Sequence, residues 1–350
     1  MLLGKRGSVH ELSPDSPCLW VEPPAPGAPS SAYMFDASDL QSRNNSSSTA
    51  DDGDNNSNDN PAPAFEGHQA GSDPAGVPKD ASASVSTSIF SVVKEPSLDL
   101  SKEACAFNQY GMCVVKGLVS KSVAKKAYVA SKSVYDDVIK AVEGSGTPNL
   151  GIGTKNGYYE IVQRTKGRYE INFGMNKTEF LHPEFVDNKW LKHFFSNVFD
   201  KSAGYTLARQ SILISFPNAH KQQWHVDGGH ISSKRHLRPH AINVFVALCD
   251  ITPEMGPTEI RPASHFLTRN LTSMMLAARA RKQLHAPVQP ALKAGDALIF
   301  DYRTLHRGTL HKASKPRALL ELVFYKNGFV DILNFPRKSL FAAAAAGEDG

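Results

Sequence analysis

Hydrophobic and polar positions change their spacing along the chain, and these changes predict where ordered structure begins. Residues 1–90 include the run NNSSSTADDGDNNSNDNPAPA, which offers too little apolar surface to offset the entropy lost on ordering. We therefore expect this segment to be disordered. From about residue 98, apolar residues at three- and four-residue steps predict a helix over 98–108 and a longer helix after Ser120 or Ser122. A Val-rich strand is expected between them, over 110–119.

The rest of the chain passes from mixed signals to a series of strands. The stretch GYYEIVQRTKGRYEINFGM predicts two strands joined at Lys166-Gly167, and HPEFVDNKWLKHFFSNVFDKSAG predicts an amphipathic helix ended by Gly204. After residue 205 strand-like runs dominate, with one helical insert over 270–284. Helices first and strands later predict an α+β protein with an antiparallel jelly-roll core. The strand-like runs are YTLARQSILISF, HAINVFVALCDI, TEIRPASHF, ALIFDYRTL and RALLELVFYK.

Charge divides the chain at the same place as hydrophobicity. The chain has 39 Lys and Arg and 34 Asp and Glu. Residues 1–90 contain 4 of the basic and 12 of the acidic residues, so their net charge is −8 and that of residues 91–350 is +13. We expect an acidic low-complexity segment over 1–90, a folded domain over 91–338 and a flexible tail over 339–350. The positive domain lacks dense basic runs interleaved with aromatic residues, which disfavours nucleic acid as a partner.

Targeting signals are not recognisable in this sequence. The N-terminal stretch MLLGKRGSVHELSPDS lacks the apolar region of a secretory signal. No apolar stretch approaches the roughly 18 residues that a membrane-spanning helix needs. These absences predict a cytoplasmic location without a membrane span.

Candidate chemistry begins with QQWHVDGGH at residues 222–230. Side chains alternate along an extended segment, so His225 and Asp227 can meet one ion, and the two following glycines allow a sharp turn. Two ligands hold a metal poorly. The best third ligand is His306, which follows the strand ALIF in a polar loop. Two His and one Asp match a non-heme Fe(II) oxygenase with three open positions, although zinc accepts the same ligands.

Arg317 favours iron with a cosubstrate. It lies eleven residues after His306 and begins the next strand. Its planar guanidinium can bind a carboxylate through two parallel hydrogen bonds, as the far end of 2-oxoglutarate requires. Alternatively, Arg317 could pair with Glu321 or Asp331. The ordered combination of HxD, His and Arg is much less expected by chance than any single part.

These residues resemble the phytanoyl-CoA dioxygenase family of Fe(II)/2-oxoglutarate-dependent oxygenases, over roughly residues 97–330. The similar features are WHVDGG, MGPTEIRPASHF, AGDALIFDYRTLHRG and KPRALLELVF, and they come in the family order. The resemblance implies a double-stranded β-helix, that is, a cupin-like jelly roll. It also implies that His225, Asp227 and His306 are the iron ligands and that Arg317 anchors 2-oxoglutarate.

Further candidates surround this set, and one departs from the family pattern. The family often has Ser or Thr two residues after the second His, to share the cosubstrate carboxylate; here Gly308 stands there, and Thr309 is the candidate substitute. Asn243 in INVFVAL is a candidate for bonding the cosubstrate or the backbone. Candidate substrate-pocket residues are Trp224, Thr258 and Arg261, of which Trp224 favours core packing. Arg168, Tyr169 and Asn172 could also reach the pocket.

The sequence therefore predicts a dioxygenase that uses Fe(II) and 2-oxoglutarate, with ascorbate as a candidate reductant. Related halogenases replace the carboxylate ligand by a small residue, so Asp227 favours hydroxylation of a C–H bond with release of succinate and CO₂. The expected partners are a small-molecule substrate and O₂. Two alternatives stay open: a non-catalytic jelly-roll module that binds metal, and an oxygenase acting on a protein or nucleic acid.

Overall fold

The computed structural model of the chain describes residues 91–93, 100–146, 150–232, 235–268 and 284–341. The segment 1–90 and the predicted helical insert, except residue 284, lie outside these residues. Of the predicted flexible tail, residues 339–341 are described. There Ser339 Oγ donates to Glu160 Oε1 (2.5 Å) and the Leu340 amide donates to Glu160 Oε2 (2.9 Å). The start of that tail is therefore bonded to the folded part.

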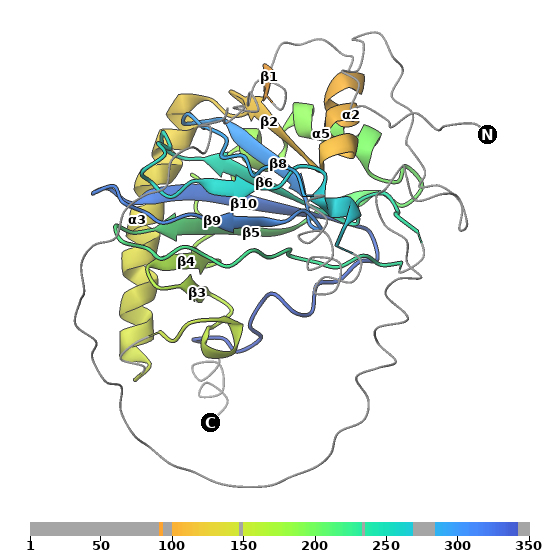
Figure 1. The fold of residues 1–350 in the computed structure, drawn as a ribbon. Helices are drawn as coiled ribbons and strands as arrows, with labels where there is room; N and C mark the ends of the chain where they lie inside the picture. The colour runs from red at the N-terminus through yellow and green to blue at the C-terminus, as the bar shows by residue number, and fades with distance from the viewer. Residues whose placement is uncertain (1–90, 94–99, 147–149, 233–234, 269–283, 342–350) are drawn as a thin grey trace, which may run out of the picture. The chain divides into compact units, whose positions relative to one another are not determined.

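A large sheet organises the described residues, in the strand order β1-β2-β8-β6-β10-β5-β4-β3 (Figure 1). Neighbouring strands pair antiparallel except β1 and β2, which are parallel. The strands are β1 (Ser91–Val93), β2 (Met112–Lys116), β3 (Ile161–Thr165), β4 (Arg168–Ile171), β5 (Tyr205–Ser215), β6 (Ala241–Ala247), β8 (Ala297–Asp301) and β10 (Arg317–Lys326).

A second, smaller sheet pairs β7 (Thr258–Ile260) with β9 (His306–Gly308) in antiparallel register. One apolar cluster joins the two sheets, because Ile260 of β7 packs with Phe245 of β6, Leu298 of β8 and Leu319 of β10. Two sheets enclosing a shared interior, with few helices, confirm the predicted double-stranded β-helix core. His306 was expected in a polar loop, but it begins β9 and is buried.

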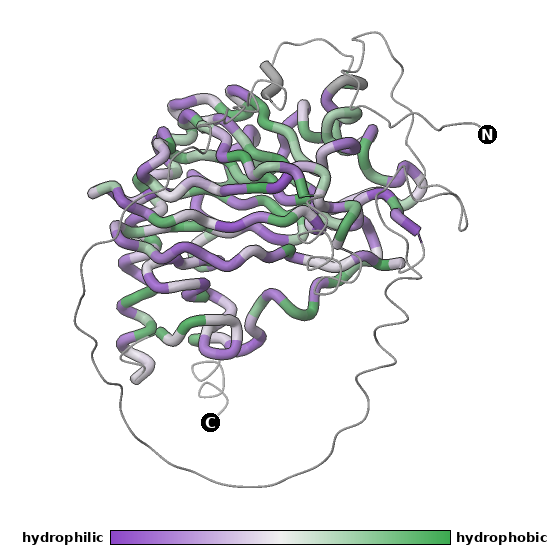
Figure 2. Tube along the Cα trace, in the orientation of Figure 1, coloured by the Kyte–Doolittle hydropathy of each residue, from purple (hydrophilic) through white to green (hydrophobic). Residues whose placement is uncertain are grey.

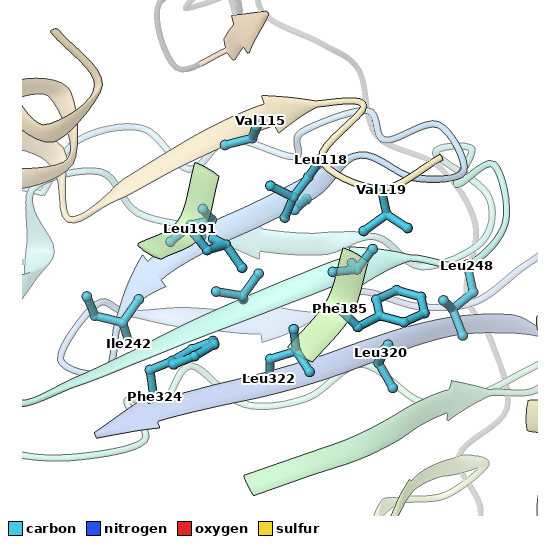
Figure 3. Packing of buried hydrophobic residues seen from close by; sticks show 14 of the residues in the cluster. Val115, Leu118, Val119, Phe185, Leu191, Ile242, Leu248, Leu320, Leu322 and Phe324 are labelled. Atoms are coloured by element: carbon cyan, nitrogen blue, oxygen red, sulfur yellow. The ribbon is translucent and has the colours of Figure 1, made fainter. Parts of the chain in front are cut away.

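Helices cover the other face of the large sheet. They are α2 (Ser101–Tyr110), α3 (Lys121–Gly144), α4 (Pro183–Val186) and α5 (Lys189–Val198), and a single-turn 3₁₀ helix η3 covers Thr154–Asn156. Figure 3 shows Leu320 and Leu322 of β10 beside Phe185 of α4 in this helix-side core. The one helix predicted up to Gly204 is instead two helices. Asn188 separates them, because its side chain accepts hydrogen bonds from the first amides of α5.

Alternation along β10 separates the helix-side core from the interior of the barrel. Leu320 and Leu322 face the helices, whereas Arg317 and Glu321, at odd positions, line a cavity between the sheets. Figure 2 shows more hydrophilic residues along β5 and β4 than along β6 and β8. The β3–β5 side of the large sheet also supplies polar groups to the cavity, namely Arg164, Thr165, Arg168, Glu170 and Ser215. Within the described part of the chain, no helix is long and apolar enough to cross a membrane.

Candidate active site

Three side chains that could hold a metal ion meet in the barrel interior. His225 and Asp227 lie on the segment between β5 and β6, and His306 begins β9. The backbones of His225 and His306 form an antiparallel bridge through amide-to-carbonyl bonds of 3.1 and 2.9 Å. Asp227 Oδ1 is 4.0 Å from His225 Nε2, and Asp227 Oδ2 is 3.5 Å from His306 Nε2. One donor atom from each residue lies within 4.8 Å of the others.

Both imidazole rings are oriented by backbone carbonyls. His225 Nδ1 lies 2.8 Å from the Gln223 carbonyl oxygen, and His306 Nδ1 lies 3.0 Å from the Thr304 carbonyl oxygen. A carbonyl only accepts, so each Nδ1 carries the proton and each Nε2 keeps a lone pair for a metal. Burial lowers the pKa of His306 to about 4, which keeps this imidazole neutral at physiological pH. The three donors therefore fit a divalent metal ion.

The carboxylate of Asp227 is held in place by neighbouring amides. Asn243 Nδ2 donates to Asp227 Oδ2 at 2.6 Å, and Asn334 Nδ2 donates to the Asp227 carbonyl at 2.5 Å. The Asp227 amide donates to the Tyr302 carbonyl at 3.0 Å. Asn243, expected as a cosubstrate or backbone contact, therefore supports the Asp227 carboxylate instead. Such outer hydrogen bonds fix the orientation of a ligating side chain.

A cavity of about 430 Å³ opens onto these three residues. Arg317 lines it from the start of β10 and is buried, and Arg168 lines it from β4. Ser215 Oγ accepts from Arg168 Nη1 (2.8 Å) and from Arg317 Nη2 (3.2 Å), so the two guanidinium groups converge on one hydroxyl. Arg317 Nη1 also donates to the Gly256 carbonyl (2.8 Å), whereas its buried Nε has no hydrogen-bond partner among the described residues.

The two arginines form an uncompensated pair of positive charges. Among the described residues neither Arg168 nor Arg317 has a carboxylate partner, so the pairing of Arg317 with Glu321 or Asp331 is not found. Burial lowers the pKa of Arg317 to about 10. Burial and the charge of Arg317 lower the pKa of Arg168 to about 9. Two buried cations side by side are costly unless an anion joins them, so this part of the wall is suited to a carboxylate.

Gly308 makes room for Arg168. A Cβ atom at Gly308 would lie 2.7 Å from Arg168 Nη1 and 2.8 Å from Gln222 Oε1, closer than real contacts allow. The position where the family often has Ser or Thr is thus filled from β4 by a guanidinium group. Thr309 is not brought to the cavity, because its hydroxyl donates to the Pro257 carbonyl at 2.9 Å and it does not line the wall.

Of the other predicted pocket residues, two line the cavity. Thr258 lines it from β7, and Tyr169 lines it from β4. Trp224 does not; its ring lies against the guanidinium groups of Arg261 (4.8 Å) and Arg307 (4.1 Å). Arg261, also outside the wall, donates to the His285 carbonyl (2.7 Å). Asn172 is not among the lining residues either.

A comparison with known families decides the relationship of this chain. The family model described as phytanoyl-CoA dioxygenase (PhyH) matches residues 107–319, which is more than half of the chain. The chain belongs to the phytanoyl-CoA dioxygenase family. It is therefore an Fe(II)- and 2-oxoglutarate-dependent enzyme, and the alternative of a non-catalytic binding module is set aside.

Solved structures resemble this phytanoyl-CoA dioxygenase family member more distantly. SnoN, a non-heme alpha ketoglutarate dependent epimerase from nogalamycin biosynthesis, has 15% identity over 64% of this chain and 81% of that chain, with a TM-score of 0.47. AviO1 from Streptomyces viridochromogenes Tue57 has 16% identity over 68% of this chain and 99% of that chain, with a TM-score of 0.47. SnoK, a carbocyclase from nogalamycin biosynthesis, has 15% identity over 69% of this chain and 88% of that chain, with a TM-score of 0.45.

In this family member, two acidic residues that the sequence pattern does not single out also line the cavity. Glu170 of β4 accepts from Arg164 Nε (2.7 Å) and from Arg209 Nε (3.3 Å). Glu321 of β10 accepts from Ser211 Oγ (2.5 Å). Burial and the neighbouring charge of Glu170 raise the pKa of Glu321 to about 8. The alternation of β10 carries a signal for Glu321, because it shares a strand face with Arg317.

Proposed function

We propose that this enzyme hydroxylates a C–H bond of a small molecule, with conversion of 2-oxoglutarate and O₂ to succinate and CO₂. The observation that carries this proposal is the convergence of His225, Asp227 and His306 beside two buried arginines without carboxylate partners among the described residues. Three protein ligands on one side of a metal leave positions for a chelating cosubstrate and for oxygen. We also propose residues 91–338 as the dioxygenase domain.

His225, Asp227 and His306 would hold Fe(II) through two Nε2 atoms and one carboxylate oxygen. Bound Fe(II), with 2-oxoglutarate and O₂, supplies the oxidising chemistry, and the protein supplies orientation and exclusion of water. The Gln223 and Thr304 carbonyls keep the two rings turned toward the ion. Asn243 keeps the Asp227 carboxylate from rotating away.

Arg317 and Arg168 would bind the far carboxylate of 2-oxoglutarate. Both guanidinium groups reach Ser215 Oγ, so a carboxylate near that hydroxyl would meet donors from two sides. Charge-assisted hydrogen bonds of this kind are strong when buried. Arg168 replaces the hydroxyl that the family often presents from the position of Gly308, which is why that residue has no side chain.

Two features favour hydroxylation of a small molecule over the remaining alternatives. Asp227 retains the carboxylate ligand that halogenation requires to be absent. The cavity of about 430 Å³ has the size of a typical small-molecule site. An oxygenase acting on a protein or nucleic acid would instead need an open groove that admits a segment of polymer.

Succinate formation tests this proposal. We expect the Fe(II)-loaded full chain to convert 2-oxoglutarate to succinate, and Asp227→Ala to abolish the conversion because the ion loses its anionic ligand. The matched control is Asp250→Asn, which changes an exposed carboxylate that pairs with Lys293. Full activity in Asp227→Ala would refute the ligand assignment. Products of candidate substrates, followed by mass spectrometry, should gain one oxygen atom from O₂; a desaturated or cyclised product would refute hydroxylation.

A further inference from the structure

The cavity wall carries six charged side chains among the described residues; two of them pair with each other, and the proposed function supplies a counter-charge to three more. They are Arg164, Arg168, Glu170, Asp227, Arg317 and Glu321. In the proposed function, Asp227 faces the metal, and Arg168 and Arg317 face the cosubstrate carboxylate. Arg164 pairs directly with Glu170. Only Glu321 is left without a counter-charge among these lining residues.

Glu170 is neutralised by two guanidinium groups. Arg164 Nη2 lies 2.5 Å from Glu170 Oε2, and Arg209 Nε lies 3.3 Å from Glu170 Oε1. The donors of Arg164 are also engaged elsewhere, since its Nη2 donates to the Asn334 carbonyl at 2.9 Å. The Arg209 guanidinium lies 3.7 Å from the centre of the Phe335 ring. These two arginines are therefore committed to Glu170 and the 334–335 segment.

Glu321 presents a carboxyl group to the cavity and forms no ion pair within the described part of the chain. It is buried, and its one hydrogen bond within the described part of the chain comes from Ser211. It lies four residues after Arg317 on the same face of β10, about 13 Å along an extended strand. Burial and the charge of Glu170 raise the pKa of Glu321, and the nearby charge of Arg209 does not outweigh them. A carboxyl group in this setting is ready to ionise when a cation arrives.

Aromatic residues complete this part of the wall. Phe245 of β6 is paired in register with Glu321, and Tyr302 follows β8; both line the cavity. Aromatic faces tolerate an organic cation, because their negative electrostatic potential attracts it. An anionic substrate would instead meet the carboxyl groups of Glu321 and Glu170.

We propose that Glu321 recognises an ammonium group of the substrate, so that the enzyme acts on a small organic amine. This inference rests on the proposed function, since it treats the cavity as the substrate site. Glu321 would transfer its proton to solvent on binding and form an ion pair with the substrate nitrogen. The carbon skeleton of the amine would then extend toward His225, Asp227 and His306.

Binding of n-butylammonium to the metal-free full chain tests the proposal without any catalytic step. Affinity is measured by ligand-observed NMR at pH 7, with 1-butanol and butyrate as probes of similar size. We expect the ammonium ion to bind more tightly than either. In Glu321→Gln its affinity should fall by roughly tenfold or more, because a desolvated ion pair is lost. Asp227→Asn should retain the preference, which separates Glu321 from the empty metal ligands.

Two controls make the result decisive. Glu143→Gln changes an exposed carboxylate at the end of α3 and should bind as the wild type does. Proton release on binding should accompany the ammonium ion in the wild type and disappear in Glu321→Gln. Equal affinity for n-butylammonium and 1-butanol, including no measurable affinity for either, would overturn the proposal. So would unchanged ammonium binding in Glu321→Gln. Neither outcome bears on succinate formation, so the proposed function would stand.

Discussion

Two regions of the cavity wall contain ionisable groups without an ion-pair partner, basic in one region and acidic in the other. In the arginine region, Arg168 and Arg317 converge on Ser215 and have no carboxylate among the described residues. In the glutamate region, Glu170 pairs with two arginines, while Glu321 forms no ion pair among the described residues. Both regions are buried, so the two arginine charges cost free energy in the ligand-free protein, whereas ionisation of Glu321 would cost free energy and the carboxyl group keeps its proton. That cost is best explained if a ligand supplies the missing charge.

The difference between the regions concerns which ligand is expected. Two cations around one hydroxyl fit the far carboxylate of 2-oxoglutarate, which every turnover of this enzyme family needs. A single protonated carboxyl group fits a substrate group, which differs between enzymes of one fold. On the two proposals above, the arginine region would serve the chemistry that the family shares, and the glutamate region would set the substrate specificity of this enzyme.

The largest effect is expected from removing a charge of the arginine region. Arg317→Met should raise the concentration of 2-oxoglutarate needed for half-maximal succinate formation by roughly a hundredfold, since one buried partner of the carboxylate is lost. The rate at saturating 2-oxoglutarate should change much less, because the lost interaction is made equally before and during the reaction.

Arg261→Met is the matched control for this variant. Arg261 is a candidate pocket residue by sequence, but it lies outside the cavity wall beside Trp224. Its replacement should leave the 2-oxoglutarate requirement unchanged. If Arg317→Met and Arg261→Met behaved alike, the arginine region would not be the cosubstrate site. Calorimetric titration of 2-oxoglutarate into the metal-loaded variants checks binding separately from turnover.

The arginine region can be predicted in part from the sequence, whereas in the glutamate region the strand alternation indicates only the direction of Glu321 and not its neighbours. The order of HxD, His and Arg along the chain is enough to indicate His225, Asp227, His306 and Arg317. The neighbours of Glu321 come from β4 and β5, which reach β10 only through the sheet order. Hydrophobic periodicity predicts strands but not which strands pair, so these contacts have no signal in the sequence.

Because the sequence does not show which strands pair, some residues have a role that differs from the expected one. Asn243 is recognisable as a polar residue on an apolar strand, yet its partner, Asp227, lies on a separate segment. The sequence indicates Arg168 only as a possible pocket residue, because its distance from Gly308 depends on how β4 crosses beside β9. The helix boundary at Asn188 is not predicted, because its signal is confined to one capping residue. An Asn cap within an otherwise amphipathic pattern resembles part of a continuous helix.

An effect of intermediate size is expected in the glutamate region. There, Glu321 should make the free energy of unfolding depend on pH. The pKa of Glu321 is raised from 4.5 to about 8 by burial and by Glu170, with a further contribution from Asp227 and an opposing one from Arg209. The folded state thus binds a proton that the unfolded state releases. Stability from this group is complete below about pH 4.5 and is lost as pH rises through about 8, by an amount on the order of a few kcal/mol.

Urea unfolding of the metal-free protein between pH 5 and pH 9 measures this effect. Glu321→Gln should flatten the decline in the free energy of unfolding, because the amide keeps the hydrogen-bonding shape and does not ionise. Glu143→Gln, on the exposed end of α3, should keep the wild-type slope. A wild-type slope in Glu321→Gln would mean that Glu321 is already ionised at neutral pH. The two regions would then not differ in the way described above.

The smallest effect is expected at Gly308, which tests whether Arg168 belongs to the arginine region. A Cβ atom there would lie 2.7 Å from Arg168 Nη1, so Gly308→Ala should displace the guanidinium group and raise the 2-oxoglutarate requirement several-fold. Gly229→Ala is the matched control, since a Cβ atom at Gly229 meets nothing within 4 Å and neither glycine has a positive φ. Equal 2-oxoglutarate affinity in the two variants would leave Arg317 as the sole anchor. A selective loss in Gly308→Ala would show that Arg168, from β4, contributes a second cation to the cosubstrate site.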